Sequence, residues 1–276
     1  MKPIFSQVVG TVSSNNEIYA VRYAHLERTA TYNFMGGDPH DVPMPLDYFV
    51  WAIVSPERTL VVDTGFDAAQ AANRKRTLVR PVEDGLRAIG IEHSRVNEVI
   101  ITHMHYDHAG NHHLFPNARI HLQDAEMRYC TGRCMTHTHL RAPFEADDVA
   151  CMVRRVFDDQ VEFHDGDADL APGVSLHQVG GHTPGLQVVR VATARGPVVL
   201  ASDAAHFYAN FDQGRPFPIL YNVADYLEAH RKIRKLAASD AHIIPGHDPA
   251  VLTRYPRARE QLPDIVRVDL DPLGSH

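Results

Sequence analysis

The sequence predicts an α/β protein in which two β-sheets pack against each other and helices cover their outer faces. Short apolar runs typical of strands alternate with segments of helical periodicity along the 276 residues. No Pro-, Gly- or Ser-rich linker divides the chain. Several of the apolar runs end in His or Asp, as strands do when they deliver side chains to the edge of a sheet. This pattern suggests a four-layer arrangement, although composition alone does not distinguish it from other α/β folds.

The first half of the chain carries strands that are rich in β-branched and aromatic residues. The expected strands are Glu17–Leu26, Leu46–Val54, Thr59–Asp63, Val99–Thr102 and Ala118–Leu122. The second and third of these form a hairpin around residues 55–58. Helical spacing predicts helices over Pro81–Ile89, which Gly90 would end, and over Ala109–Phe115. Another helix is expected over Ala125–Cys130, with Asp124 as its N-cap.

The second half of the chain mixes strands and helices in the same way. The expected strands are Val161–His164, Val174–Val179, Leu186–Ala192 and Val198–Ser202. Turns at 165–167 and 172–173 join the first two, and a turn at 195–197 makes a hairpin of the last two. Apolar residues at helical spacing predict helices over Glu145–Phe157 and Asn222–Ala238, the second of which would pack on a sheet.

Two segments are expected to lie over a functional site. Residues 27–46 are aromatic and glycine-rich, and a loop of that length in a compact domain is usually functional or disordered. Its Tyr32, Phe34 and Met35 either form an apolar, substrate-binding wall or pack the loop onto the body of the protein. Residues 131–160 are interpreted as an insertion that also covers the site.

The chain is organised around a dense group of potential metal ligands at residues 102–110. His103, His105, Asp107 and His108 follow a buried strand at the spacing H-x-H-x-D-H. His103 and His105 alternate, so an extended backbone would direct both to the same side. Asp107 and His108 follow at the turn, where they can face a second ion. Imidazole and carboxylate together suit zinc, and also iron or manganese.

Three further residues supply ligands of the same kind. His182 follows a strand and two glycines, Asp203 ends the apolar run 198–202, and His247 follows the apolar run 243–245 and Gly246. His182 or His247 would more often be an ordinary polar residue if it stood alone. Because all of them end strands, we expect them to converge with the first group at one pole of the molecule.

These motifs resemble those of the metallo-β-lactamase fold, and within that superfamily the N-acyl-homoserine lactonase branch. The turn Asp63-Thr64-Gly65 after an early strand adds to the resemblance. The resemblance implies an αββα sandwich of two mixed sheets, formed by residues 1–276 as a single domain. It implies that one metal is held by His103, His105 and His182, and a second by Asp107, His108 and His247. Asp203 would bridge the two ions.

The same resemblance implies hydrolysis of a lactone by a metal-bridging hydroxide. Two divalent ions, most simply Zn²⁺ with Fe, Mn or Co as alternatives, would lower the pKa of water toward roughly 7 and polarise the carbonyl. Asp107 would ligate and also transfer a proton to the leaving alkoxide. Such lactonases usually carry a tyrosine three residues after the bridging aspartate, where this chain has His206. His206 is expected to face the substrate, with Tyr208 as an alternative hydroxyl donor.

The segment Cys130–His139 offers Cys130, Cys134, His137 and His139, but their spacing is not a common structural zinc pattern. We expect it to line the pocket instead. Arg133 and Arg141 would then bind a substrate carboxylate, which would favour an acidic or aromatic lactone.

The charge and cysteine content of the chain limit the kinds of molecule that it is expected to bind. The formal net charge of −7 and the lack of a dense Lys/Arg run argue against nucleic acid or an anionic membrane surface as partner. The expected partner is a small lactone or ester. The three Cys do not form a disulfide framework, and the first residues lack a sustained apolar run, so a cytoplasmic protein is expected. Relatives of this kind are often dimers, which makes a homodimer an open expectation.

The histidines exceed everyday usage, with 19 in the chain. We expect the ligands, with His113 and His206 beside them, to account for the excess. Others such as His25, His93 and His230 are interpreted as surface residues.

Other activities share the metal motif. A glyoxalase II-like thioester hydrolase is the nearest alternative, although no basic glutathione-binding helical segment is evident. A mononuclear non-haem iron persulfide dioxygenase would need only His103, His105 and His182, whereas the full ligand set fits two metals better. Diiron flavoproteins carry an added flavodoxin domain. A non-catalytic binding module is disfavoured because degenerate relatives typically lose ligands.

Overall fold

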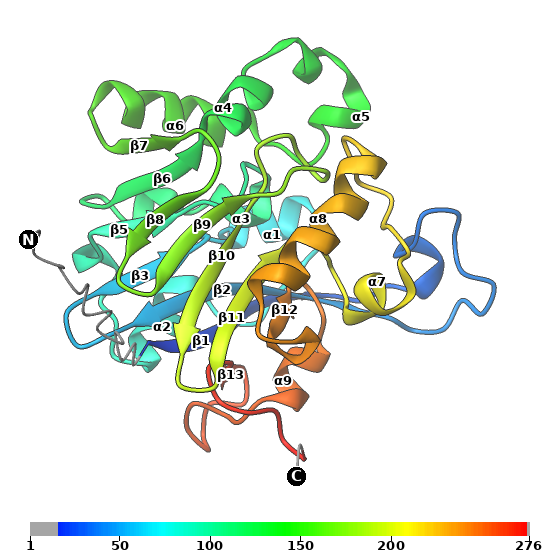
Figure 1. The fold of residues 1–276 in the computed structure, drawn as a ribbon. Helices are drawn as coiled ribbons and strands as arrows, with labels where there is room; N and C mark the ends of the chain where they lie inside the picture. The colour runs from blue at the N-terminus through cyan, green and yellow to red at the C-terminus, as the bar shows by residue number, and fades with distance from the viewer. Residues whose placement is uncertain (1–15, 275–276) are drawn as a thin grey trace, which may run out of the picture.

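The computed structural model describes residues 16–274 and contains two sheets packed face to face with helices on their outer sides (Figure 1). The predicted four-layer αββα architecture is therefore confirmed. The N-terminal residues, where we expect no export signal, lie outside the described range. None of the described helices combines the length and apolar character needed to cross a membrane.

The first sheet is mixed and has the order β13-β1-β2-β3-β5-β6-β7, with β4 paired to β1. The pairs β3–β5, β5–β6 and β6–β7 are parallel, and the pairs around β1 and β2 are antiparallel. Its strands are β1 Glu17–Leu26, β2 Leu46–Val54, β3 Thr59–Val62, β4 Thr77–Leu78, β5 Glu98–Ile100, β6 Arg119–Gln123, β7 Val161–His164 and β13 Ile265–Arg267.

The second sheet has the order β12-β11-β10-β9-β8 and is also mixed, because β11 and β12 are parallel and the other pairs are antiparallel. Its strands are β8 Ala168–Ala171, β9 Val174–Gln178, β10 Gln187–Thr193, β11 Gly196–Ser202 and β12 Ile243–Pro245. Strand β8 lies between the turns that we predicted at 165–167 and 172–173, and it pairs with β9. Strand β13 and the short β4 were also absent from the prediction.

The α-helices are α1 Ala68–Asn73, α2 Val82–Ala88, α3 Tyr106–Ala109, α4 Asp124–Cys130, α5 Thr138–Arg141, α6 Ala146–Phe157, α7 Tyr208–Gln213, α8 Val223–Leu236 and α9 Ala250–Arg254. Helices α2, α4, α6 and α8 match predicted ones, whereas α1, α5, α7 and α9 were not predicted. The predicted helix Ala109–Phe115 is wrong: α3 begins inside the ligand motif and a 3₁₀ turn, His112–Leu114, follows it. Asp124 lies in the first turn of α4 and is not its N-cap.

Alternation along the strands separates three apolar layers. Strand β2 turns Phe49 and Trp51 toward the second sheet and Val50 toward the helices. Strand β11 likewise faces the first sheet with Val198 and Leu200. Helix α8 covers the other face of the second sheet through Ile233. Burial on both faces explains why the strands read as nearly continuous apolar runs.

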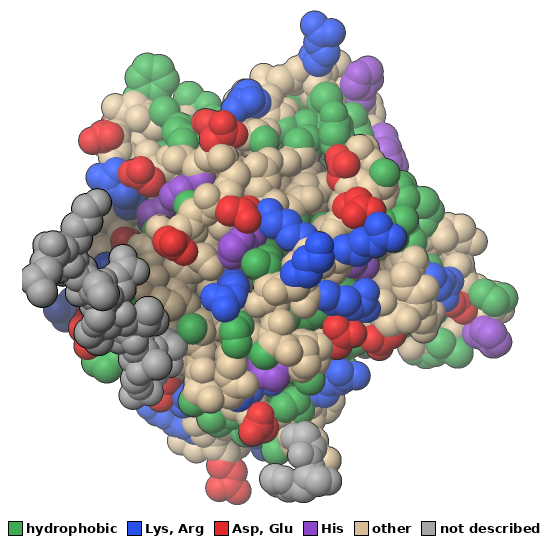
Figure 2. Space-filling model, viewed as in Figure 1, with side chains coloured by type: hydrophobic (Ala, Val, Ile, Leu, Met, Phe, Trp, Pro, Cys, Tyr) green, Lys and Arg blue, Asp and Glu red, His purple; other side chains and the backbone are tan. Residues whose placement is uncertain are grey.

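Charged side chains of both signs intermingle on the face shown in Figure 2, where Lys and Arg gather over α8. Within that helix Arg231 contacts Glu228 at 2.6 Å, and Lys232 contacts Asp167 at 2.6 Å. This face is therefore not a continuous basic surface.

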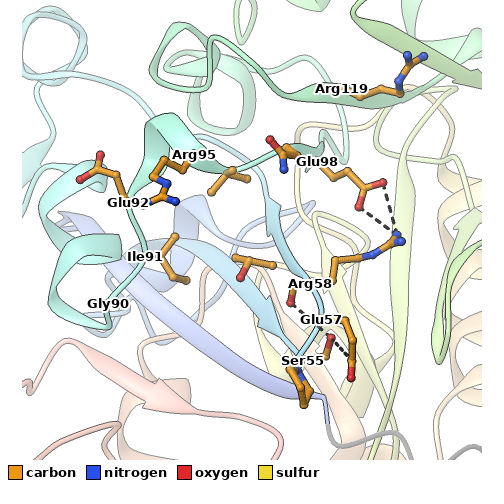
Figure 3. A pocket seen from close by; sticks show the side chains of 13 residues that line it. Ser55, Glu57, Arg58, Gly90, Ile91, Glu92, Arg95, Glu98 and Arg119 are labelled. Carbon is orange, nitrogen blue, oxygen red and sulfur yellow. Dashed lines mark hydrogen bonds and ion pairs between the residues drawn. The ribbon is translucent and has the colours of Figure 1, made fainter.

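A cavity of about 720 Å³ lies at the amino ends of β3, β5 and β6, where Thr59, Glu98 and Arg119 line it (Figure 3). Arg58 contacts Glu98 at 3.1 Å within it. Because the predicted metal ligands follow the carboxyl ends of strands, this cavity is at the opposite edge of the sheet.

Two expectations about histidines are wrong. His230 is buried and its Nε2–H donates to the carbonyl of Ala204 at 2.8 Å, so it is not a surface residue. His113 is exposed, and it is His112 that is buried in this turn. The sequence could not show which of the adjacent imidazoles faces inward, because a 3₁₀ turn has a different periodicity from the α-helix that we predicted.

Arg155 makes the protonation state of His112 a determinant of stability. The guanidinium Nε–H donates to His112 Nδ1 at 3.0 Å, so this nitrogen must be unprotonated. Burial and the charge of Arg155 lower the pKa of His112 from 6.5 to about 4. The native state then binds fewer protons than the unfolded state between these values, and stability is lost as the pH falls through this window.

We expect His112→Asn to remove this dependence, because asparagine keeps an acceptor near Nδ1 and does not titrate. As the pH falls below the unfolded-state value, the free energy of unfolding of the wild type should decline relative to the variant by about 1.4 kcal/mol per pH unit. Urea denaturation at a series of pH values measures the difference. A difference that does not change with pH would contradict the assignment.

Candidate metal centre

The ligand side chains gather where strands of both sheets end. His103 and His105 follow β5, and the parallel strands β11 and β12 place Asp203 and His247 beside them. His182 lies in the turn between β9 and β10. The sequence prediction that these strand ends converge is confirmed by the interatomic distances.

Three imidazoles form the first group. His103 Nε2 and His105 Nδ1 are 3.0 Å apart, and His182 Nε2 lies 3.1 Å from the former and 2.9 Å from the latter. All three residues are buried. Burial lowers the pKa of His103 and His105 well below the ordinary value, and that of His182 to about 4. Neutral imidazoles are the form that ligates a metal.

The second group consists of Asp107, His108 and His247. Asp107 Oδ2 lies 3.7 Å from His108 Nε2 and 3.8 Å from His247 Nε2. Burial lowers the pKa of His108, but Asp203 and Asp107 raise it more, and the net pKa is well above the ordinary value. This subsite therefore favours a positive charge.

Asp203 joins the two groups. Its Oδ1 lies 3.2 Å from His108 Nε2 and 3.0 Å from His247 Nε2, whereas its Oδ2 lies 3.3 Å from His182 Nε2. One carboxylate thus presents one oxygen to each group, as a bridging ligand must.

The donor set fits two divalent cations. His108 Nε2 and Asp203 Oδ1 are buried without a hydrogen bond, which is costly unless another partner satisfies them. Imidazole nitrogens and carboxylate oxygens suit zinc and its neighbours in the first transition row. The predicted ligands therefore form the groups that could each hold an ion.

Neighbouring acceptors fix the orientation of several ligands. His108 Nδ1 lies 2.7 Å from Asp63 Oδ2, which directs Nε2 into the centre. His182 and His247 donate from Nδ1 to the carbonyls of Ile219 and Asp47, at 2.6 and 2.9 Å. Asp63 itself has a φ of 61° and accepts from the Thr102 amide at 2.7 Å, so the predicted Asp-Thr-Gly turn supports the metal centre.

Glu126 is a supporting residue that sequence reasoning missed. It is fully buried on α4 and accepts from the Met104 amide at 2.9 Å and from the Gly185 amide at 3.2 Å. It thereby connects the loop that carries His103 and His105 to the turn that carries His182. Burial raises the pKa of Glu126 to about 7. A lone acid in a short helix gives no sequence signal for this role.

His206 lies at the centre, whereas Tyr208 does not. His206 Nε2 is 2.9 Å from Asp203 Oδ2, and its ring stacks on Phe217 with centroids 3.5 Å apart. Burial lowers the pKa of His206 to about 4, so the ring is neutral. Tyr208 packs between the two sheets, with the guanidinium of Arg254 over its ring.

The loop residues predicted to bind substrate have mixed placements. Phe34 is buried, with the guanidinium of Arg215 3.9 Å from its ring centre, so it packs the loop onto the body. Tyr32 and Met35 are 63% and 43% exposed. The loop is drawn in blue beside α7 in Figure 1.

The predicted insertion divides into two parts. Helix α6 packs on the outer face of the first sheet through Met152, while His139 and Leu140 of α5 line a small cavity with His105. Arg133 and Arg141 are exposed. Arg141 donates to the carbonyls of Met135 and Thr136, and no contact of either arginine with the ligand cluster is found. Within residues 16–274, no potential metal site includes a cysteine.

Gly185 permits the contact between Glu126 and the His182 turn. A Cβ at this position would lie 2.1 Å from the Glu126 amide nitrogen, so Gly185→Ala must separate α4 from the turn. We expect a loss of about 1–3 kcal/mol of stability and roughly tenfold weaker metal binding, measured by titration with a competing chelator. Gly90→Ala is the control, because it strains a residue with φ of 87° and no neighbour within 4 Å of its Cβ. Equal metal affinity in both variants would refute the coupling.

Comparisons with known proteins agree with this centre. The model of the metallo-beta-lactamase superfamily matches residues 44–247. An N-acyl homoserine lactonase of Bacillus sp is 28% identical over 189 residues, which are 62% of this chain and 70% of that protein. The N-acyl homoserine lactonase AttM of Rhizobium johnstonii is 26% identical over 243 residues, covering 81% of this chain and 89% of the relative.

Solved structures show the same fold. A quorum-quenching N-acyl homoserine lactone lactonase superposes with a TM-score of 0.71 at 22% identity, over 87% of this chain and 94% of that one. AidC, a dizinc quorum-quenching lactonase, superposes with a TM-score of 0.67 at 15% identity, over 86% and 90%. Because the family model covers most of the sequence and the ligand geometry is complete, the chain belongs to the metallo-beta-lactamase superfamily.

Proposed function

We propose that this protein is a metal-dependent hydrolase that opens the ring of a lactone. The observation that carries the proposal is the carboxylate of Asp203, which presents one oxygen to each of two ligand groups. Two relatives of this chain are named N-acyl homoserine lactonases, and these names support a lactone as the substrate class.

Bound divalent ions would supply a nucleophile from water near neutral pH and would polarise the ester carbonyl. The residues of the chain set the geometry for this chemistry. Asp203 fixes the spacing between the two ligand groups, and Asp63 holds His108 toward the centre. The imidazoles of the first group, His103, His105 and His182, stay neutral, so they can bind a cation instead of protons.

Asp107 is placed to handle the proton of the leaving alkoxide. It is 9% exposed, more than any other predicted ligand, so it lies at the open edge of the buried cluster. A carboxylate at the entrance can both ligate a cation and reach a departing oxygen. The position of Asp107 in the motif also suggests that this one residue both binds metal and carries a proton.

His206 supplies a hydrogen-bond donor for the oxyanion. Its ring is held in place by Phe217, and Nε2 lies next to the bridging carboxylate. The one N–H of the neutral imidazole faces Asp203 Oδ2 here. It would serve the carbonyl oxygen once bound cations engage that carboxylate in its place. His206 stands where the lactonases that this chain resembles carry a tyrosine.

A glyoxalase II-like thioester hydrolase is the second candidate, because the same ligand set would serve it. The persulfide dioxygenase is less favoured, since it requires only the first group. We further propose zinc as the metal, because the donors are mostly imidazole. A cytoplasmic location and a homodimer remain predictions.

The first test is a pH-stat assay of acid release from γ-lactones, acyl-homoserine lactones, aromatic lactones and a glutathione thioester. We expect zinc-loaded enzyme to hydrolyse at least one class of lactone and to lose this activity on treatment with a chelator. Hydrolysis of the thioester alone would favour the second candidate. Inactivity on all of them, together with bound iron, would favour the dioxygenase.

A pair of variants separates the two donors that the sequence left open. His206→Phe should lower kcat roughly 10²–10³-fold, because it removes a donor to the oxyanion. Tyr208→Phe should leave kcat near the wild-type value, since its ring lies in the core between the sheets. Metal content, measured by elemental analysis, should be the same in both. Comparable losses in the two variants would contradict the role assigned to His206.

A further inference from the structure

Arg28 and Arg76 stand out because both are half-buried and neither contacts a carboxylate of the described residues. Arg28 donates to the carbonyl of Tyr32. Arg76 donates from Nε to the Tyr106 hydroxyl at 3.1 Å and from Nη1 to the carbonyl of Arg74. No ion pair of either arginine occurs within residues 16–274, and the remaining residues of the sequence contain neither Asp nor Glu.

The backbone brings the two arginines to the same place. Strand β4 pairs with β1 so that His25 faces Thr77, and the residues that follow β1 run beside those that precede β4. Arg28 and Arg76 therefore lie on adjoining segments. The charge of Arg76 adds to burial in lowering the pKa of Arg28, which agrees with this placement.

Hydrogen-bonded phenols connect this pair to the metal centre. The Tyr106 hydroxyl, which receives the bond from Arg76, donates to the Tyr48 hydroxyl at 3.4 Å. The ring of Tyr48 lies against the ring of His247, with centroids 5.1 Å apart. Tyr106 itself stands between His105 and Asp107 in the sequence. The guanidinium of Arg76 is thus connected to the second ligand group through two phenols, and Arg28 is near enough to the centre that its charge helps to lower the pKa of His206.

The neighbouring Arg74, in contrast, forms an ion pair with a carboxylate. Arg74 stacks over the ring of Tyr106 at 3.9 Å and is paired with Glu145, with Nε 3.0 Å from Oε1. Arg76, on the same tyrosine, has no such acid. Asp107 attracts Arg76 from beyond contact distance and helps to raise its pKa. No ion pair within residues 16–274 joins the two, and the Asp107 carboxylate belongs to the ligand group.

Two partly buried like charges destabilise a protein unless an anion accompanies them. The protein carries a net charge of −7, so an anionic ligand also needs a local positive site to approach. Guanidinium groups match the planar, paired oxygens of a carboxylate and also bind phosphate.

We propose that Arg28 and Arg76 bind an oxyanion of the substrate, so that the preferred lactone carries a carboxylate away from its ring. This inference rests on the proposed function and gives its substrate class. It transfers to Arg28 and Arg76 the role that the sequence suggested for Arg133 and Arg141, which are exposed.

Matched substrates test the proposal. The probes are γ-butyrolactones that carry a carboxylate at increasing distances from the ring, each compared with its primary amide. With the zinc-loaded wild type, kcat/KM for the best carboxylate should exceed that for its amide roughly tenfold or more. In Arg28→Gln and Arg76→Gln this ratio should fall toward one, mainly through KM. Arg76→Lys keeps the charge but loses the paired geometry, and its ratio should be intermediate.

Arg95→Gln is the control for net charge, because Arg95 is exposed and lines the cavity at the opposite edge of the sheet (Figure 3). Its ratio should equal that of the wild type. Thermal melting of each variant identifies any loss of folding. If the wild-type enzyme has a kcat/KM for the amides equal to or higher than that for the carboxylates, the proposed anion site is wrong. The proposed hydrolase activity would not be affected by that result.

A binding measurement keeps the two proposals separate. If no lactone is hydrolysed, calorimetry of the same carboxylate and amide with the zinc-loaded protein tests the site without turnover. Stronger binding of the carboxylate that Arg28→Gln abolishes would support the site, and equal binding of both probes would overturn it. Inorganic phosphate should compete with the carboxylate in the wild type only. Equal competition in Arg28→Gln would indicate binding elsewhere and would count against the pair.

Discussion

The buried carboxylate of Asp203 is the feature on which the metal centre depends. It faces imidazoles on both sides, and burial would raise its pKa if His247 and His108 did not lower it far more. Its position requires unusual backbone: Ser202 before it has a φ of 44°. A Cβ at Gly246 would lie 2.9 Å from Asp203 Oδ1, so only glycine lets the end of β12 approach. Conformational cost is therefore concentrated where both sheets deliver ligands.

Two further acids hold the ligands from outside. Asp63 and Glu126 are both fully buried, yet each accepts hydrogen bonds from loops that carry ligands. Glu126 accepts from two backbone amides, whereas Asp63 also contacts an imidazole. These acids tie β3 and α4 to the ligand loops, so the outer layer of helices helps to position the metal centre. The four-layer fold and the centre thus stabilise each other.

The sequence predicted what depends on local spacing. Strand periodicity located β2 and β11, and the spacing of His103, His105 and Asp107 located the centre. It could not reveal Glu126, because no pattern distinguishes an acid that faces a backbone amide from one that faces water. The burial of His230 and the exposure of Arg133 also depend on tertiary packing, which local sequence patterns do not reveal. Strands β8 and β13 were missed because their pairing, and not their composition, makes them strands.

The residues that we propose to contact substrate lie on segments outside the sheets. Arg215 joins two of them: it contacts Asp38 at 2.8 Å and the Gly37 carbonyl at 2.9 Å, and it follows the turn that ends α7. The neighbouring Phe217 stacks on His206, so the loop before β2 is connected to the proposed oxyanion donor. Arg28 begins that same loop. This loop carries Arg28 and contacts the segment that holds the proposed oxyanion donor. We therefore expect changes in the loop to alter specificity while the sheets and their metal ligands stay unchanged.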